Sequence, residues 1–317
     1  MKKDKIFSIS VGITAYNEEK NIKSLILAIL SQKIESSFIK EILVISDGSS
    51  DGTYNKISDI KDKRIKSFNE KKRQGQNSRF NQLLLSMSGD ILIFFDADTI
   101  PVNNHYISLL VEPLIEKKNI SVVYGASRPY ISQNIGLFEQ IISTVDFTKE
   151  RMLKSLDNGD SLWLCGTGKA FLKKAMERFY WPKDVPEDTY IYLYCKKNNI
   201  KVSFQPKAIL YYRSPGNFID YLKKTTKYKK GKDMQKKYFN ADFLNKQYYL
   251  PKKWILDFYL KLLSKPTFLF MYLIILILSR IFHLFAPEFN PLWDISYSTK
   301  NLERLTNKYE KNKYEKM

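Results

Sequence analysis

Hydrophobic and polar positions along the first hundred residues alternate between strand-like and helix-like patterns. The run Phe7–Ala15 is rich in β-branched residues, and Ile22–Leu30 then carries apolar residues at helical spacing. The unit repeats, because the buried-type run Glu41–Ser46 precedes a helix that starts at Tyr54 and extends to Ile60. Strands that alternate with helices predict right-handed crossovers and a parallel sheet. The pattern therefore indicates the α/β class, with a mostly parallel sheet flanked by helices.

Polar residues gather at the points where the predicted strands end. A third helix, roughly Gln76–Met87, leads into the strongly apolar strand Ile91–Phe95. Carboxyl ends of parallel strands meet at one edge of the sheet, and ligands of such sheets bind there. We therefore expect three clusters, distant in the sequence, to form one site. They are Tyr16-Asn17-Glu18, Asp47-Gly48-Ser49 and Asp96-Ala97-Asp98.

The third cluster indicates a metal site. Asp96 and Asp98 directly follow a dry strand, where unpaired charges are costly. A hard divalent cation, Mg²⁺ or Mn²⁺, would offset this cost by binding carboxylates together with the phosphate oxygens of a substrate. Such an ion stabilises a diphosphate as a leaving group. Because aspartates are also common in turns, a turn without a metal is the alternative.

The most apolar stretch lies near the other end, over residues 267–286, and is just long enough to cross a bilayer. It contains Arg280 and His283 and has basic residues on both sides, which weakens the orientation signal for a simple span. A membrane helix and a re-entrant hairpin both fit this pattern. The preceding segment, Trp254–Leu263, places apolar residues on one helical face beside lysines, as in an interfacial helix. A helix packed on a soluble core is the alternative.

Composition adds an anionic partner to this picture. Among 317 residues, Lys and Arg number 52 and Asp and Glu 33, which gives a net charge of +19. This excess suits nucleic acid, phospholipid headgroups or phosphorylated substrates.

A hydrophobic share of 44% is enough for a sizeable core, and the length suggests about two domains. Cys165 and Cys195 form no Cys-x-x-Cys pair, so a reducing compartment is expected, and the N-terminal pattern does not resemble a signal peptide.

Three segments, residues 12–22, 42–53 and 89–101, together resemble the family 2 inverting glycosyltransferases, and the resemblance runs from about Ser8 to Gly231. It implies a GT-A fold, which is Rossmann-like, and a nucleotide-sugar donor. By resemblance, Asp96 contacts the ribose or diphosphate and Asp98 the metal, Mg²⁺ or Mn²⁺. Asp47 accepts a hydrogen bond from the base, which suits the imide of uracil and hence a UDP-sugar. The other residues that the resemblance places at the nucleotide are Ala15, Tyr16, Asn17, Glu18 and Arg79.

Two later segments resemble the sugar side of the same site. Gly166, Thr167 and Gly168 match a small-residue segment where the missing side chains let a sugar approach the backbone. The resemblance implies that Asp188 is the catalytic base and that Glu187 orients it. A single in-line displacement needs a carboxylate to take the proton of the attacking hydroxyl. The alternative is that the two acids only favour the start of a helix.

One departure from the family pattern concerns the acceptor. Processive members usually carry a Gln-x-x-Arg-Trp-like motif, whereas Lys227 and Tyr228 stand in the corresponding run here. Lys227 and Tyr228 could substitute for that Arg and Trp, which would place Lys227 at the diphosphate. Because a lysine does not bind phosphate bidentately as arginine does, we expect transfer of one or few sugars and not processive synthesis. A hydroxyl of a lipid-linked saccharide or glycolipid is the expected acceptor, because the Glu187–Asp188 pair supplies a base. A polyprenyl-phosphate sugar synthase, whose phosphate acceptor needs no base, is the alternative.

Two other classes of protein were weighed against this interpretation. A nucleic-acid-binding protein would explain the charge but not four carboxylates directed at one site. An inactive membrane-bound scaffold would bind a nucleotide without transferring a sugar. The expected location is the cytoplasmic face of the cell membrane, where lysines meet anionic lipids. The predicted parts are a catalytic domain (1–215), a basic amphipathic interfacial segment (216–265), a hydrophobic helix or hairpin (266–286) and a polar tail (287–317) that could be disordered.

Overall fold

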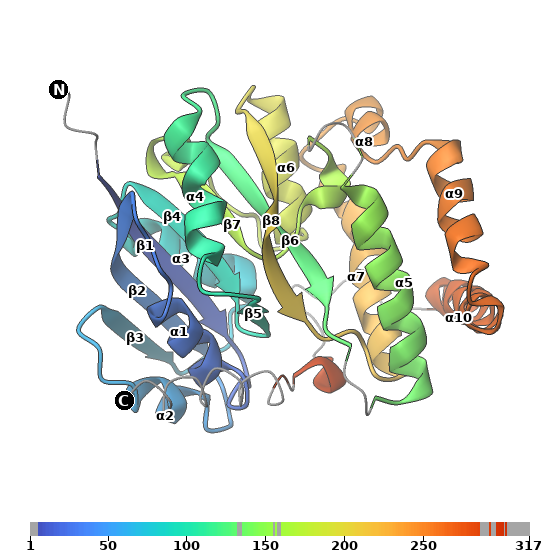
Figure 1. Ribbon diagram of the computed structural model, residues 1–317, viewed down its shortest axis with the longest axis horizontal. Coiled ribbons are helices and arrows are strands. Elements are labelled where there is room, and N and C mark those ends of the chain that lie inside the picture. Colours follow the sequence, from blue (N-terminus) through green and yellow to red (C-terminus); the bar gives the residue numbers. More distant parts are fainter. Residues whose placement is uncertain are drawn as a thin grey trace.

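A central eight-stranded sheet organises the chain in the computed structural model, which describes residues 6–131, 135–154, 156, 160–285, 292, 296–300 and 302 (Figure 1). The strand order is β3-β2-β1-β4-β7-β6-β8-β5. The pairs β1–β2, β2–β3, β1–β4 and β6–β8 are parallel, whereas β7 runs antiparallel to β4 and β6, and β5 runs antiparallel to β8. The strands are β1 (Phe7–Ala15), β2 (Ser37–Asp47), β3 (Ile65–Glu70), β4 (Ile91–Asp96), β5 (Thr99–Pro101), β6 (Val122–Pro129), β7 (Lys169–Leu172) and β8 (Val202–Tyr212).

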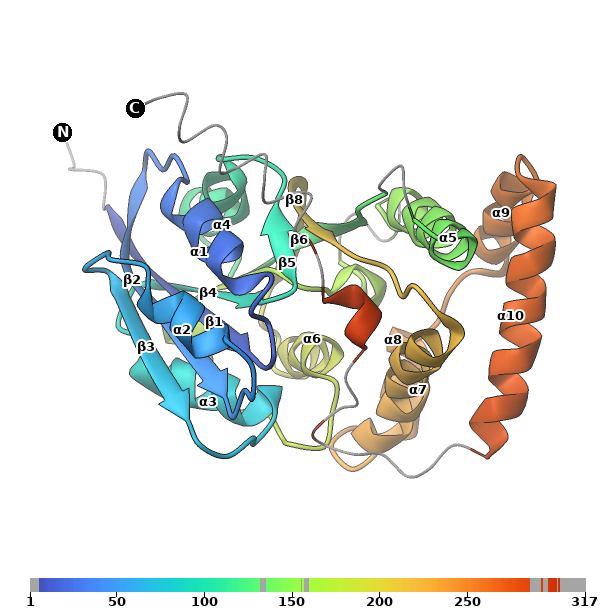
Figure 2. The same cartoon turned by 90° about the horizontal axis from the view of Figure 1, so that it is seen from below.

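Helices cover both faces of this sheet. One face packs against α1, α2 and α4, and the other against α3 and α6 (Figure 2). The remaining helices extend beyond the sheet on the side of β6 and β8. The α-helices are α1 (Ile22–Leu30), α2 (Thr53–Ser58), α3 (Gln76–Ser86), α4 (Tyr106–Glu116), α5 (Leu137–Leu153), α6 (Glu187–Lys197), α7 (Phe218–Gln235), α8 (Ala241–Gln247), α9 (Lys252–Leu262) and α10 (Pro266–Leu284). The 3-10 turns are η2 (Leu162–Leu164), η3 (Lys173–Met176) and η4 (Tyr297–Thr299).

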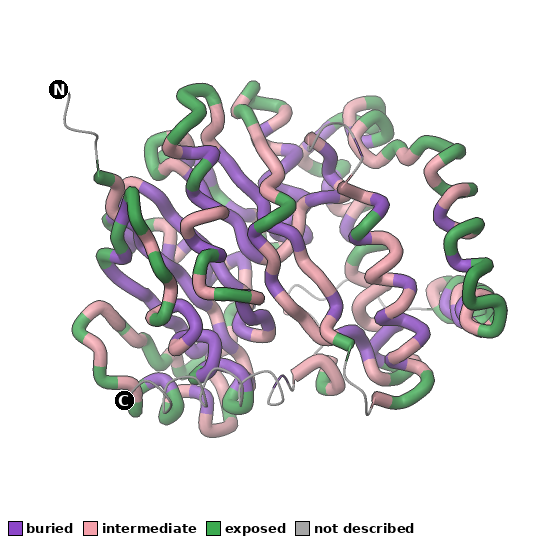
Figure 3. The backbone as a smooth tube through the Cα atoms, viewed as in Figure 1, coloured by how far each residue is buried: buried purple, intermediate pink, exposed green. Residues whose placement is uncertain are grey.

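The predicted α/β class is confirmed, and so is the sheet flanked by helices. The helix expected over Ile22–Leu30 has those bounds, because its apolar stripe packs on β1 and β2. The strand expected over Ile91–Phe95 is β4, which is central and buried on both faces. Buried positions concentrate in the strands (Figure 3). The antiparallel strand β7 was not predicted, since its short apolar run carries no period that reveals direction.

An aromatic cluster fixes α3 and α6 against the face of the sheet that these two helices cover. Trp181 is fully buried, with its ring centroid 5.5 Å from those of Phe80 and Phe94 and 4.5 Å from that of Phe179. The indole N–H of Trp181 donates to the carbonyl of Glu187 at 3.1 Å. This hydrogen bond ties the start of α6 to the core, and it therefore fixes where the two acids of that helix lie.

The predicted division of the C-terminal part needs two corrections. The structure joins α7 to the catalytic unit, since Gln235 is fully buried and donates to the hydroxyl of Thr189 at 2.7 Å. The boundary at 215 therefore divides a unit that packs together. Residues 266–284 form the single helix α10, which excludes the hairpin for them. Among the described residues, α10 alone is long and apolar enough to cross a membrane by length and composition, and only 17% of its most apolar stretch is buried.

The described residues of the predicted tail pack on the catalytic domain. Leu302 is buried with Ala28 and Ile100, and its backbone N–H donates to the amide oxygen of Asn21 at 2.9 Å. Ser298 donates through its hydroxyl to Asp220 of α7 at 2.6 Å. The expectation of a disordered tail is therefore wrong for residues 296–300 and 302. The prediction for the rest of 287–317, apart from residue 292, lies outside the described residues.

Candidate active site

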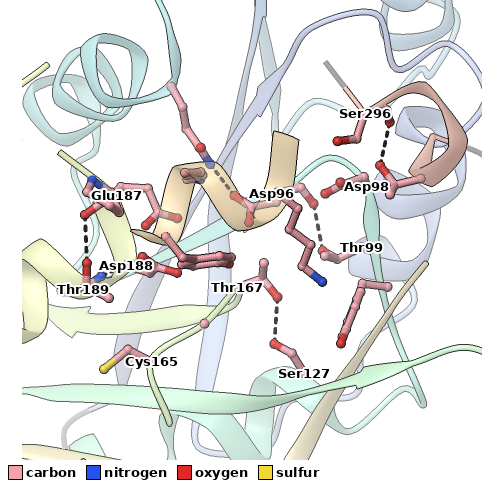
Figure 4. Close-up of a pocket in the computed structure, with 18 of the residues that line it drawn as sticks. Asp96, Asp98, Thr99, Ser127, Cys165, Thr167, Glu187, Asp188, Thr189 and Ser296 are labelled. Atoms are coloured by element: carbon pink, nitrogen blue, oxygen red, sulfur yellow. Dashed lines mark hydrogen bonds between the residues drawn. The ribbon is translucent and has the colours of Figure 1, made fainter. Parts of the chain in front are cut away.

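One cavity of about 1170 Å³ lies at the carboxyl ends of β1, β2 and β4, and it extends between α5, α7 and α10. All three predicted polar clusters contribute to it, which agrees with the expectation that they converge. Figure 4 shows carboxylates from the end of β4 and the start of α6 drawn around this space. The predicted site residues that line it are Ala15, Tyr16, Glu18, Asp47, Asp96, Asp98, Gly166, Thr167, Glu187, Asp188 and Lys227.

Asn17 shapes the loop after β1 and does not line the cavity. Its φ of 53° is left-handed, a conformation that asparagine tolerates better than most residues. Its amide oxygen accepts from the N–H of Ser50 at 2.9 Å, and its own N–H donates to the hydroxyl of Ser49 at 3.1 Å. Asn17 therefore joins the loops after β1 and β2. This places Tyr16 and Glu18, on either side of it, in the cavity wall.

Arg79, which the resemblance places at the nucleotide, does not line the cavity. Arg79 is buried away from the cavity lining, and its guanidinium donates to Asp47 at 2.6 Å and lies 3.3 Å from Glu70. A buried arginine needs such partners, because a lone charge in the interior is costly. The cavity is lined instead by Arg73, whose guanidinium lies 3.9 Å from the ring centroid of Tyr16. No periodic pattern distinguished these two arginines in the sequence.

The carboxylate of Asp47 is engaged mainly in holding the segment that follows β3 and contains Arg73, although Asp47 also lines the cavity. Its carboxylate accepts from the N–H groups of Gln74 and Gly75 at 2.9 and 2.8 Å, besides its bond to Arg79. Gly48 follows with a φ of +70°, and a Cβ there would come within 2.6 Å of the backbone nitrogen of Arg73. Asp47 and Gly48 therefore hold the segment with Arg73 close to the end of β2. The role of Asp47 toward a nucleotide base stays a prediction.

Asp96 and Asp98 bring excess negative charge to the end of β4. Asp96 accepts from the side-chain amide of Gln76 at 2.5 Å. Burial, with the charges of Glu187 and Asp98, raises the pKa of Asp96 to about 7 against the opposing effect of Lys169. Two oxygen ligands with uncompensated charge fit a hard divalent cation. Within the described part of the chain no group of three acidic, His or Cys side chains forms a fuller cage, so substrate phosphate and water would complete the coordination.

Glu187 and Asp188 open α6 with both side chains buried. Asp188 accepts from the N–H of Thr189 at 2.7 Å. Burial and the neighbouring charge of Glu187 raise the pKa of Asp188 to about 6, with Lys227 and Lys169 opposing this shift. Asp188 is therefore ionised at neutral pH and can accept a proton, which suits a general base.

Lys169 was not identified from the sequence, although it holds this pair of acids in place. Its ammonium is 1% exposed and donates to Glu187 at 2.9 Å. Glu187, Asp96 and Asp188 all raise the pKa of Lys169, so it stays charged despite burial. The signal in the sequence is a lysine that directly precedes the short apolar run Ala170–Leu172. The pair fixes Glu187 beside Asp188.

The small-residue segment lines the same cavity as the acids. The hydroxyls of Thr167 and Ser127 lie 2.9 Å apart and are hydrogen-bonded (Figure 4). Gly166 and Thr167 line the cavity, whereas Gly168 does not. Gly168 has a φ of +76°, and a Cβ there would clash with the hydroxyl of Tyr106. Its role is therefore conformational, which corrects its assignment to the sugar side.

A residue from the far C-terminal segment also lines the cavity. The ammonium of Lys300 donates to Glu18 at 2.7 Å, to the carbonyl of Asn17 at 3.1 Å and to the carbonyl of Tyr16. Burial and Asp98 raise the pKa of Glu18 to about 7, and Lys300 opposes this shift. Lys300 therefore holds the loop after β1 in place through these three contacts. The sequence gave no signal for a contact across 282 residues.

Replacing Lys300 by Met is expected to weaken UDP binding by roughly 10-fold, about 1.4 kcal/mol. The reason is that Glu18 would lose its ion pair, and the left-handed turn at Asn17 would lose one support. Titration calorimetry with UDP measures the effect, with Lys56→Met on the exposed surface of α2 as the control. Unchanged UDP affinity in Lys300→Met would show that the loop after β1 keeps its conformation without Lys300.

The profile of Glycosyl transferase family 2 matches residues 10–179, which is more than half of the chain. The chain belongs to glycosyl transferase family 2. It is thus a glycosyltransferase, and the resemblance noted in its motifs is confirmed. The matched range includes Asp96 and Asp98 but ends before Glu187 and Asp188, so their roles rest on the geometry above.

Among the relatives of this glycosyltransferase is UDP-Glc:alpha-D-GlcNAc-diphosphoundecaprenol beta-1,3-glucosyltransferase WfgD of Escherichia coli. It is 27% identical over 196 residues, which cover 61% of this chain and 71% of the relative. A poly-beta-1,6-N-acetyl-D-glucosamine synthase of Staphylococcus aureus is 24% identical over 220 residues, or 67% of this chain. The match spans only 51% of that synthase.

The fold agrees with solved structures of glycosyltransferases. The mannosyltransferase PcManGT from Pyrobaculum calidifontis, in complex with GDP-Man and Mn²⁺, superposes with a TM-score of 0.62. The alignment covers 82% of this chain and 76% of PcManGT at 17% identity. The predicted GT-A fold is therefore confirmed.

Proposed function

We propose that this glycosyltransferase is an inverting enzyme that moves a sugar from a nucleotide-sugar to a hydroxyl of a lipid-linked acceptor. The observation that carries the proposal is the shared cavity of Asp188 and the Asp96–Asp98 pair. A base with a pKa of about 6 and a pair of carboxylates suited to a metal would act on the two sides of one anomeric carbon. A nucleic-acid-binding protein would need neither group.

The residues suggest a single displacement. The acceptor hydroxyl would lose its proton to Asp188 as its oxygen bonds to the anomeric carbon, and the bond from that carbon to the diphosphate would break. The configuration inverts because attack and departure take place on opposite faces. Glu187, held by Lys169 at 2.9 Å, would keep Asp188 oriented. The nucleoside diphosphate would leave toward the loop that carries Tyr16 and Arg73.

Asp96 and Asp98 would hold Mg²⁺ or Mn²⁺ together with the donor diphosphate. When bound, the ion would neutralise charge that develops on the leaving diphosphate. The raised pKa of Asp96 supports this assignment, because burial and then the charges of Glu187 and Asp98 disfavour its ionised form, which a bound cation would stabilise. Lys227 would add a positive charge nearby, because it already lowers the pKa values of both Asp96 and Asp188.

Similarity to WfgD supports the choice of substrates. Its name gives UDP-Glc as donor and a GlcNAc-diphosphoundecaprenol as acceptor. We infer a UDP-sugar donor and a saccharide on a lipid carrier for this chain. A polyprenyl-phosphate acceptor is already ionised and would leave Asp188 without a proton to take, so the buried base favours a hydroxyl acceptor.

We infer that the catalytic domain sits at the cytoplasmic face of the membrane, with α10 in the interface. Tyr272, Ile275 and Ser279 of α10 are buried, and the helix contacts α5, α7 and α9. A helix that packs one face on the catalytic domain cannot be surrounded by lipid, whereas its other face is apolar and exposed. The exposed residues of that face include Phe270, Leu273, Ile274, Ile277, Leu278 and Ile281. Exposed lysines of α9 would meet anionic headgroups.

The proposal is tested by titration calorimetry of the detergent-solubilised protein with UDP and GDP, in Mn²⁺ or in EDTA. Wild type is expected to bind UDP only with the metal, and Asp98→Ala is expected to lose at least 10-fold in affinity, about 1.4 kcal/mol. Asp59→Ala, on the exposed end of α2, is the control. Failure of wild type to bind either nucleotide in any condition would favour the inactive scaffold.

A further inference from the structure

Arg280 is a charged residue near the C-terminal end of α10, the most apolar helix among the described residues. It is exposed and lines the cavity together with Leu276, one turn earlier on α10. Within the described residues no carboxylate pairs with Arg280. A charged side chain within an apolar, membrane-associated helix is rare and marks a functional site by default. An anion at the cavity would explain why an arginine stands here.

Polar contacts between α7 and α10 fix where Arg280 lies. The imidazole Nε2 of His283 is 3.1 Å from the hydroxyl of Thr226 and 3.4 Å from that of Thr225. His283 lies three residues after Arg280, so these contacts hold the adjacent turn of α10 against α7. Arg280 therefore reaches the cavity from the membrane side, while Asp188 reaches it from the sheet side.

Two more cations, on the helices that α10 contacts, line the same cavity. Lys149 of α5 lies 3.4 Å from the hydroxyl of Tyr272, with no ion pair among the residues that the structure describes. Lys224 of α7 pairs with Asp146 at 3.3 Å. Asp146 also accepts from the hydroxyls of Tyr212 and Ser214, at 3.2 and 3.0 Å.

The acidic groups at this end do not neutralise the cations. Glu150 is engaged elsewhere, by Lys154 at 2.5 Å and by Arg128 at 3.4 Å. Asp146 pairs with Lys224. The set of Lys149, Lys224, Arg280 and Asp146 in the cavity lining therefore carries a net positive charge. Its charge is suited to a ligand with more than one negative charge.

We propose that Lys149, Lys224 and Arg280 form a subsite for the diphosphate of the lipid-linked acceptor. This inference rests on the proposed function and deepens it. The acceptor sugar would lie at Asp188, the diphosphate one sugar farther toward α10, and the lipid along the exposed apolar face of that helix. A guanidinium bonds two phosphate oxygens at once, which favours a diphosphate over a single point contact.

A phospholipid headgroup shares the phosphate chemistry but fits this place less well. Headgroups are met by the lysines on the outer surface of α9, among them Lys252, Lys253 and Lys261, all exposed. The subsite cations instead line the catalytic cavity. Only a ligand that extends from the membrane to the catalytic base would contact them together with Asp188.

The test measures binding of farnesyl diphosphate, farnesyl monophosphate and farnesol to the full detergent-solubilised chain by calorimetry. Wild type is expected to bind the diphosphate most tightly and the alcohol least. Arg280→Gln is expected to lose roughly 10- to 100-fold in affinity for the diphosphate, as for a charge-assisted hydrogen bond. Lys253→Gln removes the same charge from exposed α9 and is expected to have no effect. UDP binding with Mn²⁺, measured on the same samples, is expected to stay unchanged in both variants.

Several outcomes would overturn the subsite. Equal diphosphate affinity in wild type and Arg280→Gln, with UDP binding intact, would refute it and leave the proposed function standing. Equal losses in Arg280→Gln and Lys253→Gln, matched by equal losses in binding to phosphatidylglycerol vesicles, would identify headgroup adsorption instead. If wild type does not bind UDP in the presence of Mn²⁺, the proposed function itself is contradicted. If Arg280→Gln does not fold by circular dichroism, Lys149→Gln makes the same test.

Discussion

Asp188→Asn is expected to lower the rate of sugar transfer by roughly 10²- to 10⁴-fold, the usual contribution of a general base. The amide keeps the size of the carboxylate but cannot take the proton of the acceptor hydroxyl. Binding of UDP is expected to stay within about twofold, because the proposed donor contacts lie on the loops after β1, β2 and β4. Trial substrates are UDP-glucose and a GlcNAc-diphospho-lipid, with UDP release as the readout.

The pH dependence distinguishes a base from a residue that only maintains structure. Because the pKa of Asp188 is about 6, the fraction of the ionised base rises as pH increases through 6. The wild-type kcat/KM is expected to rise through that range and level off above it. In Asp188→Asn this rise of kcat/KM with pH, the acidic limb of the profile, is expected to disappear. Full activity of the variant, or an unchanged limb, would assign the proton transfer to another group.

Lys169→Met is expected to destabilise the fold by about 3–5 kcal/mol, as when one partner of a buried ion pair is removed. Glu187 is 3% exposed and would keep a charge with no compensating ammonium. One oxygen of Glu187 already has no hydrogen-bond partner among the described residues. Urea unfolding in detergent measures the loss, and Lys174→Met, exposed in η3, is expected to change stability by less than about 0.5 kcal/mol.

A second substitution separates charge from packing in this result. Lys169→Met combined with Glu187→Gln removes both charges, so much of the lost stability is expected to return. If the double variant is as unstable as Lys169→Met, the loss comes from packing of the lysine stem on Phe80, whose ring centroid lies 5.4 Å from the ammonium. Transfer activity is expected to stay low in either variant, since Asp188 would lose its oriented neighbour.

Local pattern was enough to predict the elements that hold the donor side. The helix over Ile22–Leu30 and the strand before Asp96 follow from apolar periodicity and from the polar residues that interrupt it. The convergence of three clusters follows from the geometry of parallel strands, whose carboxyl ends share an edge. These inferences need only short-range information, and the structure agrees with them.

Partner choice among side chains could not be predicted in the same way. Arg73 and Arg79 lie only six positions apart, yet one lines the cavity and the other pairs with Asp47. Lys169 could be identified as a lysine in an apolar strand, but not as the partner of Glu187. Each of these outcomes depends on which buried carboxylate a cation reaches, and this is set by packing between elements far apart in the chain.

The sequence by itself determined the α/β class, the family and the acids placed at the ends of β4 and at the start of α6. Three features depend on the folded chain: Lys300 supports the loop after β1, α7 packs with the catalytic unit, and Arg280 lines the cavity. The physical reason is range. Periodicity and turn chemistry act over a few residues, whereas a buried charge finds its partner wherever the folded chain brings one within hydrogen-bond distance.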